Sequence, residues 1–326
     1  MPPSAEPTVT IVLASRDGER FLGQALAGLA AQSRPADEYV LVDDGSRDGT
    51  GALLAAFAAS QPRARVLRRD GVGPAAACDA AVREAGGTFI AIHDDDDVSR
   101  PDRLERELAF LVAHPDVALV GSAAERTDAE GRVTGTESQP PDDAAIRARL
   151  RRAPAFVHGS VMMRREAYLA AGGYRASFAV SEDYDLYLRL SERGRLANLP
   201  EPLYRWRAHP DNTFARRRGE HLLYAAIARA FAWERAQGRP DSGRALARAA
   251  SAEAFAAAGP LAPRIARYRG EALVRDGRVA GARRVLARAF APGGEAPAAL
   301  AWWAASWAVA LTPRAARVRA AGRAPR

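Results

Sequence analysis

The sequence predicts an α/β protein with a mostly parallel sheet flanked by helices, followed by a C-terminal region that is entirely helical. Short apolar runs alternate with segments of helical periodicity as far as about residue 215, a pattern typical of repeated βα units. The apolar runs are nearly continuous, as in residues 9–13, which suits strands buried on both faces of a parallel sheet. After about residue 218 the strand pattern stops, and alanine, arginine and leucine recur at helical spacing.

The first part of the chain predicts strands and helices in alternation. The fourth helix is expected to begin just after Pro101, because the first turn of a helix needs no N–H at that position. The strands are expected at residues 9–14, 39–42, 64–67, 89–92 and 117–121, and the helices between them at residues 20–31, 51–59, 75–84 and 103–113.

The alternation continues less regularly as far as residue 206. Glycines are expected to end two more helices, at Gly172 and at Gly194. The expected elements are a strand at residues 159–164, helices at residues 166–171 and 181–193, and two short edge strands at residues 196–199 and 203–206. From residue 220 to 291 we expect helical hairpins, broken at residues 238–240, 259–260 and 277.

Composition narrows the function classes. The formal charge is +8, and all 47 basic residues are arginines scattered among 39 acidic ones. We therefore expect no nucleic-acid binding, although phosphates or an anionic membrane face remain suitable partners. The single cysteine, Cys78, forbids an intramolecular disulfide, and the N-terminus lacks a secretory pattern. The expected location is the cytoplasm.

Four consecutive aspartates at residues 94–97 are the most informative local feature. They follow the apolar run 89–92, with only His93 between. Adjacent carboxylates repel one another, which indicates that a cation binds there. Mg²⁺ and Mn²⁺ prefer oxygen ligands and usually take one or two carboxylates together with substrate phosphates. The alternative is a solvated acidic loop that caps the next helix.

A second acidic pair, Asp43 and Asp44, also follows a predicted strand. Because the carboxyl ends of parallel strands share one edge of a sheet, both clusters are expected to meet in one site. The alternative for Asp43 and Asp44 is an ordinary turn, since Gly45 and Ser46 follow.

Several segments carry a recognisable order and spacing: residues 9–22, Gln32-Ser33, residues 42–50, residues 94–104, residues 158–166, Gly172-Gly173-Tyr174 and residues 182–190. Together they resemble family 2 glycosyltransferases with a GT-A fold, with residues 94–104 matching the DxD region and residues 182–190 the ED motif. The resemblance covers roughly residues 8–215 and implies a catalytic domain at residues 1–215, with a C-terminal helical region at residues 216–326.

The resemblance implies the residues that hold the nucleotide. Asp44 would accept a hydrogen bond from the base, and Ser15 would lie beside the nucleotide. Asp94 or Asp95 would bind the ribose. Arg16 stands where the family commonly has a tyrosine that stacks on the base, and a guanidinium plane can also stack.

The resemblance also implies the metal ligands and the catalytic base. Asp96 would bind Mn²⁺ or Mg²⁺, and His209 would lie near the metal and the diphosphate. Asp183 would be the base, although a first-turn carboxylate can simply cap its helix. His209 standing alone would be an ordinary loop histidine, and His158 is expected to be structural rather than catalytic.

Cys78-Asp79 replaces the family's Arg-Asn and removes a cation from the expected phosphate region. Arg68 or Arg69 are the residues that could compensate. These departures leave open which nucleotide is used.

The implied activity is inverting transfer from a nucleotide-diphosphate sugar to a hydroxyl of a saccharide or lipid-linked glycan, in cell-surface polysaccharide or glycoconjugate synthesis. One alternative is a nucleotidyltransferase, which the single glycine in the turn at residues 15–18 disfavours. Another is a catalytically degenerate module that only binds sugar nucleotides.

The charge-free stretch at residues 298–311 contains three tryptophans and precedes several arginines. This pattern suits peripheral contact with the inner face of the cell membrane. The alternative is a terminal helix docked on the helical region.

Overall fold

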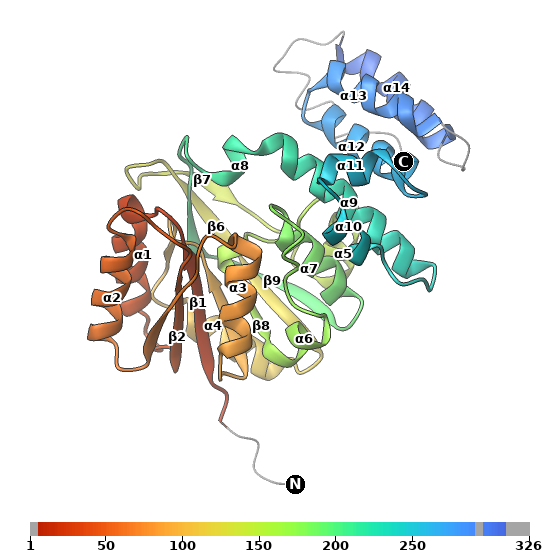
Figure 1. Ribbon diagram of the computed structural model, residues 1–326. Coiled ribbons are helices and arrows are strands. Elements are labelled where there is room, and N and C mark those ends of the chain that lie inside the picture. Colours follow the sequence, from red (N-terminus) through yellow and green to blue (C-terminus); the bar gives the residue numbers. More distant parts are fainter. Residues whose placement is uncertain (1–5, 291–295, 311–326) are drawn as a thin grey trace. The chain divides into compact units, whose positions relative to one another are not determined.

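The computed structural model describes residues 6–290 and 296–310 and divides the chain into two units, Met1–Asn212 and Thr213–Arg326 (Figure 1). Each unit has its own core and is described by itself.

In the described part of the first unit, nine strands form one sheet in the order β3-β2-β1-β4-β8-β6-β9-β5, with β7 paired to β6. The strands β1 to β4 are parallel, whereas β8 is antiparallel to both of its neighbours. The strands are β1 (Val9–Ser15), β2 (Glu38–Asp43), β3 (Ala64–Arg68), β4 (Phe89–His93), β5 (Val98–Ser99), β6 (Val117–Thr127), β7 (Val133–Glu137), β8 (Met162–Arg164) and β9 (Arg195–Arg207).

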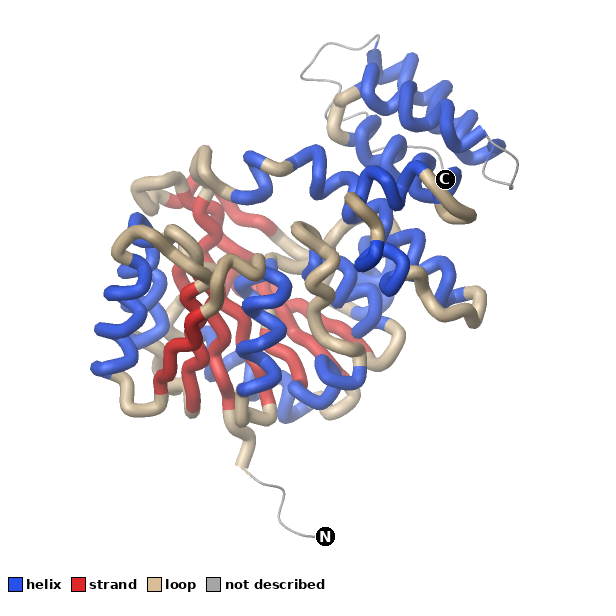
Figure 2. Tube along the Cα trace, viewed as in Figure 1, coloured by secondary structure: helices blue, strands red, loops and turns tan. Residues whose placement is uncertain are grey.

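Helices cover both faces of this sheet (Figure 2). Leu13, Leu41 and Ala91 are buried on one face of the sheet, and Val12, Val40 and Ile92 are buried on the other. The core therefore lies on both sides of β1, β2 and β4. The helices are α1 (Glu19–Ala30), α2 (Thr50–Ser60), α3 (Pro74–Glu84), α4 (Arg103–Ala113), α5 (Asp143–Leu150), α6 (Arg165–Ala170) and α7 (Glu182–Ser191), with a 3₁₀ turn η1 (His158–Ser160).

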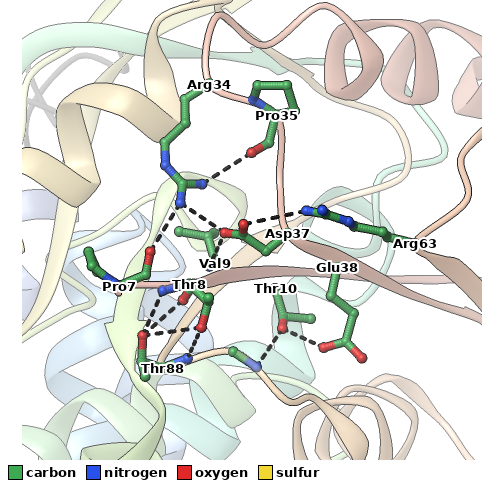
Figure 3. A network of polar contacts seen from close by, with 11 residues as sticks. Pro7, Thr8, Val9, Thr10, Arg34, Pro35, Asp37, Glu38, Arg63 and Thr88 are labelled. Atoms are coloured by element: carbon green, nitrogen blue, oxygen red, sulfur yellow. Dashed lines mark hydrogen bonds and ion pairs between the residues drawn. The ribbon is translucent and has the colours of Figure 1, made fainter. Parts of the chain in front are cut away.

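Polar contacts fix the start of β1 at the amino-terminal edge of the sheet (Figure 3). The Asp37 carboxylate accepts hydrogen bonds from the Val9 N–H and from the Arg34 guanidinium, both at 2.8 Å. Burial raises the pKa of Asp37, but these hydrogen bonds and the charges of Arg34 and Arg63 outweigh it and lower the pKa. This edge is therefore held by its own network, away from the acidic clusters at the other ends of the strands.

The expected α/β architecture is present, and the second half of the sheet is more mixed than the sequence suggested. The two short edge strands expected at residues 196–199 and 203–206 are one long strand, β9, which lies between β6 and β5. Its register shifts against β6 around Pro202, so the prolines interrupt the pairing without ending the strand. The strand expected at residues 159–164 begins instead as η1 and continues as β8, and β5, β7 and α5 were not expected.

The described part of the second unit is helical. α12 packs against α9, α13 and α14, with Leu273, Val274 and Leu286 in the core. Its elements are α8 (Thr213–Arg216), α9 (Arg218–Ala236), α10 (Gly243–Arg248), α11 (Ala252–Ala257), α12 (Ala262–Arg275), α13 (Val279–Ala287), the 3₁₀ turn η2 (Arg288–Phe290) and α14 (Ala296–Ala310). Within residues 6–290 and 296–310, no helix combines the length and the apolar character needed to cross a bilayer.

The tryptophan-rich stretch begins in α14. Trp302 is buried in the core of the second unit and has the Arg275 guanidinium 4.7 Å from its ring centroid. Leu300 is exposed. The side chain of Trp307, and the residues from Leu311 through Pro313 to the final arginines, lie outside the described residues.

Candidate active site

The carboxyl-terminal ends of β1, β2 and β4 lie level at one edge of the sheet. Ser15 pairs with Asp43 in the β1–β2 register, and Leu13 pairs with His93 in the β1–β4 register. The Ser15 hydroxyl donates a hydrogen bond to Asp95 Oδ2. The acidic residues that follow β2 and β4 therefore reach the same edge, as expected of parallel strands.

Asp44 is turned towards the loop before α3. Its two carboxylate oxygens accept hydrogen bonds from Val72 N at 2.7 Å and from Gly73 N at 2.8 Å. Arg16 borders the same loop, because a Cβ built on Gly71 would lie 2.8 Å from Arg16 Nη1. Asp44 and Arg16 thus lie close together, and their contact with a nucleotide base stays a prediction.

Each of the first three acids at residues 94–97 is held by a different part of the chain. Asp94 Oδ1 lies 2.8 Å from Nδ1 of His158 in η1, and Asp95 is held by Ser15 of β1. Asp96 Oδ2 lies 2.9 Å from His209 Nε2 and accepts a hydrogen bond from Asn212 Nδ2 at 2.9 Å, both in the segment after β9.

Asp95, Asp96 and Asp97 lack a matching positive charge, whereas burial of Asp94 is outweighed by the charge and hydrogen bond of His158, which lower its pKa. Burial and the neighbouring charge of Asp96 raise the pKa of Asp95 to about 7. Burial and the charge of Asp94 raise the pKa of Asp96, although His209 acts in the opposite direction. Burial and Asp96 also raise the pKa of Asp97 well above its usual range. A bound cation would stabilise the ionised form of all of them.

The arrangement fits a metal that is held only in part by the protein. Among the described residues, no cluster of three or more histidine, cysteine or acidic side chains forms a ready metal cage. Asp96 and His209 are nevertheless in contact, so both can reach one cation. Mg²⁺ usually binds one or two carboxylates and completes its shell with water and substrate phosphates. This donor set meets that description, provided that a diphosphate supplies further oxygens.

Asp183 lies in the first turn of α7 and is partly exposed. The residue before the helix, Ser181, has a φ of 58°, which is uncommon for a non-glycine residue and sets the direction of the helix start. Burial and the charge of Asp183 raise the pKa of Glu182 to about 7.

His158 connects the ED motif electrostatically with the acidic loop. Burial lowers its pKa, but the charges of Asp94, Asp183 and Glu182 outweigh burial and raise the pKa of His158 to about 10. Asp183 is therefore close enough to the acidic loop for their charges to act on the same imidazole.

Comparison with known proteins decides the family. The profile described as Glycosyl transferase family 2 matches residues 10–170. EpsE of Bacillus subtilis (strain 168), described as a glycosyltransferase, is 35% identical over 227 residues, which cover 68% of this chain and 80% of EpsE. The chain belongs to glycosyl transferase family 2. The amylovoran biosynthesis glycosyltransferase AmsE of Erwinia amylovora is 31% identical, with 64% of this chain and 79% of AmsE covered.

Solved structures confirm the GT-A fold of this family 2 member. S. aureus TarS 1-349 in complex with UDP-GlcNAc has a TM-score of 0.59 at 14% identity and covers 92% of this chain and 90% of its own. The mannosyltransferase PcManGT from Pyrobaculum calidifontis, in complex with GDP-Man and Mn2+, has a TM-score of 0.57 at 21% identity. It covers 98% of this chain and 87% of its own.

Arg207 is a site residue of this family 2 protein that sequence reasoning missed. Its backbone N–H donates to Asp97 Oδ1 at 2.7 Å, and its Nε donates to the carbonyl of Asp96 at 2.8 Å. Its guanidinium lies 4.7 Å from the Phe21 ring centroid, and the ring centroids of Phe21 and His209 are also 4.7 Å apart. The alternation of Arg205 and Arg207 along a strand was the available signal, because it puts both on one face.

Arg103 supports the acidic loop from beneath and was also missed. Its side chain is 1% exposed and pairs with the fully buried Glu107 at 3.1 Å. Its Nη2 donates to the carbonyls of Ile92 and Val161 at 3.0 and 3.2 Å. Its position one turn before a glutamate was the only local signal.

The Cys78-Asp79 departure has a structural explanation. Asp79 accepts hydrogen bonds from the Tyr168 hydroxyl at 2.7 Å and from Arg83 Nε at 2.6 Å. Gly173 must be glycine here, because it has a φ of +70° and an added Cβ would lie 2.2 Å from Asp79 Oδ1. Burial raises the pKa of the Cys78 thiol, as do the nearby acidic charges.

The arginines that were expected to compensate for this departure are paired elsewhere. Arg69 pairs with Glu84 at 3.3 Å, and the largely exposed Arg68 pairs with Asp43 at 3.3 Å. Neither residue contacts the acids at residues 94–97 in the described contacts.

Proposed function

We propose that this protein is a metal-dependent, inverting glycosyltransferase that moves a sugar from a nucleotide-diphosphate donor to a hydroxyl of a saccharide or lipid-linked glycan. The observation that carries the proposal is the gathering of the acidic loop, Ser15 and His209 at one sheet edge, with Asp183 near enough to act electrostatically on His158. The names of relatives support a role in polysaccharide synthesis, because AmsE is an amylovoran biosynthesis glycosyltransferase. The ligands of TarS and PcManGT support a nucleotide-sugar donor and, for PcManGT, Mn2+.

In this proposal, different residues bind the nucleotide, the ribose and the metal. Arg16 and Asp44 flank the nucleotide, while Asp94 and Asp95 face its ribose. Asp96 and His209 would hold Mn²⁺ or Mg²⁺, which when bound neutralises charge on the departing diphosphate.

Asp183 would take the proton from the acceptor hydroxyl as that oxygen attacks the anomeric carbon. The new glycosidic bond forms as the bond to the diphosphate breaks. Attack opposite the leaving group inverts the anomeric configuration.

The distribution of charge supports an acceptor at an anionic membrane face. Residues 213–326 carry 21 arginines and seven acidic residues, whereas residues 1–212 carry 26 arginines and 32 acidic residues. Phe214, Phe290 and Leu300 are exposed in the same C-terminal unit. Basic and apolar side chains together favour binding to anionic lipid headgroups, so a lipid-linked acceptor at the inner face of the membrane suits this unit.

The decisive experiment is nucleotide release from a panel of UDP-, GDP- and dTDP-sugars with Mn²⁺ or Mg²⁺, followed by NMR of the product anomer. We expect release with at least one donor, loss of activity with a chelator, and an inverted product. Asp183→Asn should lower kcat by at least about 100-fold while leaving donor binding intact. Glu182→Gln is the matched control beside it and should have a smaller effect.

Two results would contradict specific parts of the proposal. If Asp96→Ala is fully active, or if the wild type is fully active in the presence of a chelator, the protein does not need a metal. If Asp183→Asn is fully active, Asp183 is not the catalytic base. Nucleotide binding without turnover for any acceptor would instead support a degenerate sugar-nucleotide-binding module.

A further inference from the structure

His158 occupies a junction between the two halves of the site. Its ring Nδ1 lies 2.8 Å from Asp94 Oδ1, and its Nε2 lies 3.1 Å from the Tyr174 hydroxyl. A carboxylate can only accept, so Nδ1 carries the proton in the contact with Asp94. Both ring nitrogens are therefore used, and the imidazole has little freedom to turn.

Tyr174, which contacts His158 Nε2, is itself held by residues of α6 and α3. The backbone N–H of Tyr174 donates to the Tyr168 hydroxyl at 2.9 Å, and that hydroxyl donates to Asp79 at 2.7 Å. Tyr174 itself is 4% exposed. Asp79 of α3, Tyr168 of α6, Tyr174, His158 and Asp94 are thus linked in sequence, with the side chain of Tyr174 joining its backbone contact to its hydroxyl contact.

The backbone of Gly159, next to His158, packs closely against the same carboxylate. A Cβ added to Gly159 would lie 2.8 Å from Asp94 Oδ2 and 1.9 Å from the Tyr204 hydroxyl. The Tyr204 hydroxyl in turn accepts a hydrogen bond from Asp94 N at 3.1 Å. Asp94 is therefore fixed at its backbone by Tyr204 and at its side chain by His158.

We propose that His158 is a positioning residue for donor binding: it holds the Asp94 carboxylate in place, and Tyr174 holds the imidazole. The inference deepens the proposed function and rests on it, because Asp94 matters through the donor. Without His158, repulsion from Asp95 and Asp96 would turn the Asp94 side chain away from its neighbours. Neighbours that orient a binding group commonly contribute about 10- to 100-fold to activity or affinity.

Two nearly isosteric variants distinguish the contact made by Nδ1 of His158 from the contact made by Nε2. The amide nitrogen of His158→Asn can stand near the place of Nδ1 and keep the bond to Asp94, while losing Tyr174. The amide of His158→Gln can reach the place of Nε2 and keep Tyr174, while losing Asp94. A residue that only fills space would respond similarly to both changes.

The test measures kcat and KM for donor and for acceptor, together with the melting temperature, in both variants and in Tyr174→Phe. We expect His158→Gln to raise the donor KM about tenfold with an unchanged acceptor KM. His158→Asn and Tyr174→Phe keep the hydrogen bond to Asp94, so their activity should stay within about threefold of wild type.

Each possible result either supports the positioning role of His158 or contradicts it. Equal losses in the Asn and Gln variants, or losses that follow the melting temperature and affect both substrates alike, would overturn the positioning role. If the wild type turns over no sugar nucleotide at all, the proposed function fails and this inference fails with it. A donor-specific loss confined to His158→Gln supports both.

Discussion

Replacing Arg103 by methionine should destabilise the first unit by about 4 kcal/mol, because it leaves a buried carboxylate without its partner. Arg103 donates to Glu107, to Ser99 Oγ at 3.0 Å and to two main-chain carbonyls. Breaking a buried ion pair typically costs about 3–5 kcal/mol, and the unsatisfied carbonyls add to this loss.

The pH dependence of that loss follows from Glu107. Burial raises the pKa of Glu107 to about 7, while the charge and hydrogen bonds of Arg103 act against burial. A folded-state pKa above the unfolded value means that the contribution of Glu107 to wild-type stability falls as pH rises from about 4.3 to 7, and then levels off. Without Arg103 the pKa rises further, so between pH 7 and pH 8 the variant should lose up to about 1.4 kcal/mol, whereas the wild type should lose only about 0.3 kcal/mol.

The only cysteine provides the assay, since Cys78 is buried in the first unit. Pulse labelling of its thiol across a urea series reports the unfolding of that unit rather than of the helical one. Arg106→Met is the matched control on the same helix, because its pairs are about half exposed and contribute under about 1 kcal/mol. The double variant Arg103→Met/Glu107→Leu should recover about half of the loss.

The reasoning is refuted if Arg103→Met costs no more than Arg106→Met. It is also refuted if the loss is the same at pH 7 and pH 8, or if removing Glu107 as well brings no recovery.

Three further outcomes are expected. Asp37→Asn should cost about 1 kcal/mol at pH 7 in urea unfolding. Because the folded-state pKa of Asp37 is lowered, this contribution is present above pH 4 and is lost as pH falls through the folded pKa; an equal loss at pH 3 would contradict it. Native Cys78 should resist thiol reagents at pH 8, and rapid labelling without urea would contradict its burial. Gly159→Ala should lower donor affinity, with partial recovery in Gly159→Ala/Tyr204→Phe; a donor affinity equal to wild type would contradict the close approach.

The parallel half of the sheet could be predicted because its signals are local. β1, β2 and β4 each contain a run of four apolar residues, and a helix of about three turns follows each strand from β1 to β3, while α4 follows β4 after the two-residue β5. The antiparallel half could not, because its pairings depend on partners far along the chain. β5 has only two residues and exists through its pairing with Tyr204 and Arg205 of β9.

The same contrast applies to the candidate site. The acids at residues 94–97 are visible in the sequence as a run, and the DxD resemblance gave them expected roles. The residues that hold them are not visible in this way, because the contacts of Asp94 with His158 and of Asp96 with His209 span 64 and 113 positions. The contacts of His158 and Arg207 with the acidic loop could not be predicted, because only the fold brings η1 and β9 beside that loop.

The acidic loop combines fixed geometry with unbalanced charge. Asp94, Asp95 and Asp96 are held by η1, by β1 and by the segment after β9. The raised pKa values of Asp95 and Asp96 show that their contacts do not offset burial and the repulsion between the acids, whereas the burial of Asp94 is outweighed by the charge and hydrogen bond of His158, which lower its pKa. A site of this kind binds a cation without rearranging its ligands, and the cation supplies the missing charge. Because the protein offers no complete metal cage in its described residues, the diphosphate that brings further oxygens should also strengthen metal binding. Donor and metal are therefore expected to bind cooperatively, each completing the site for the other.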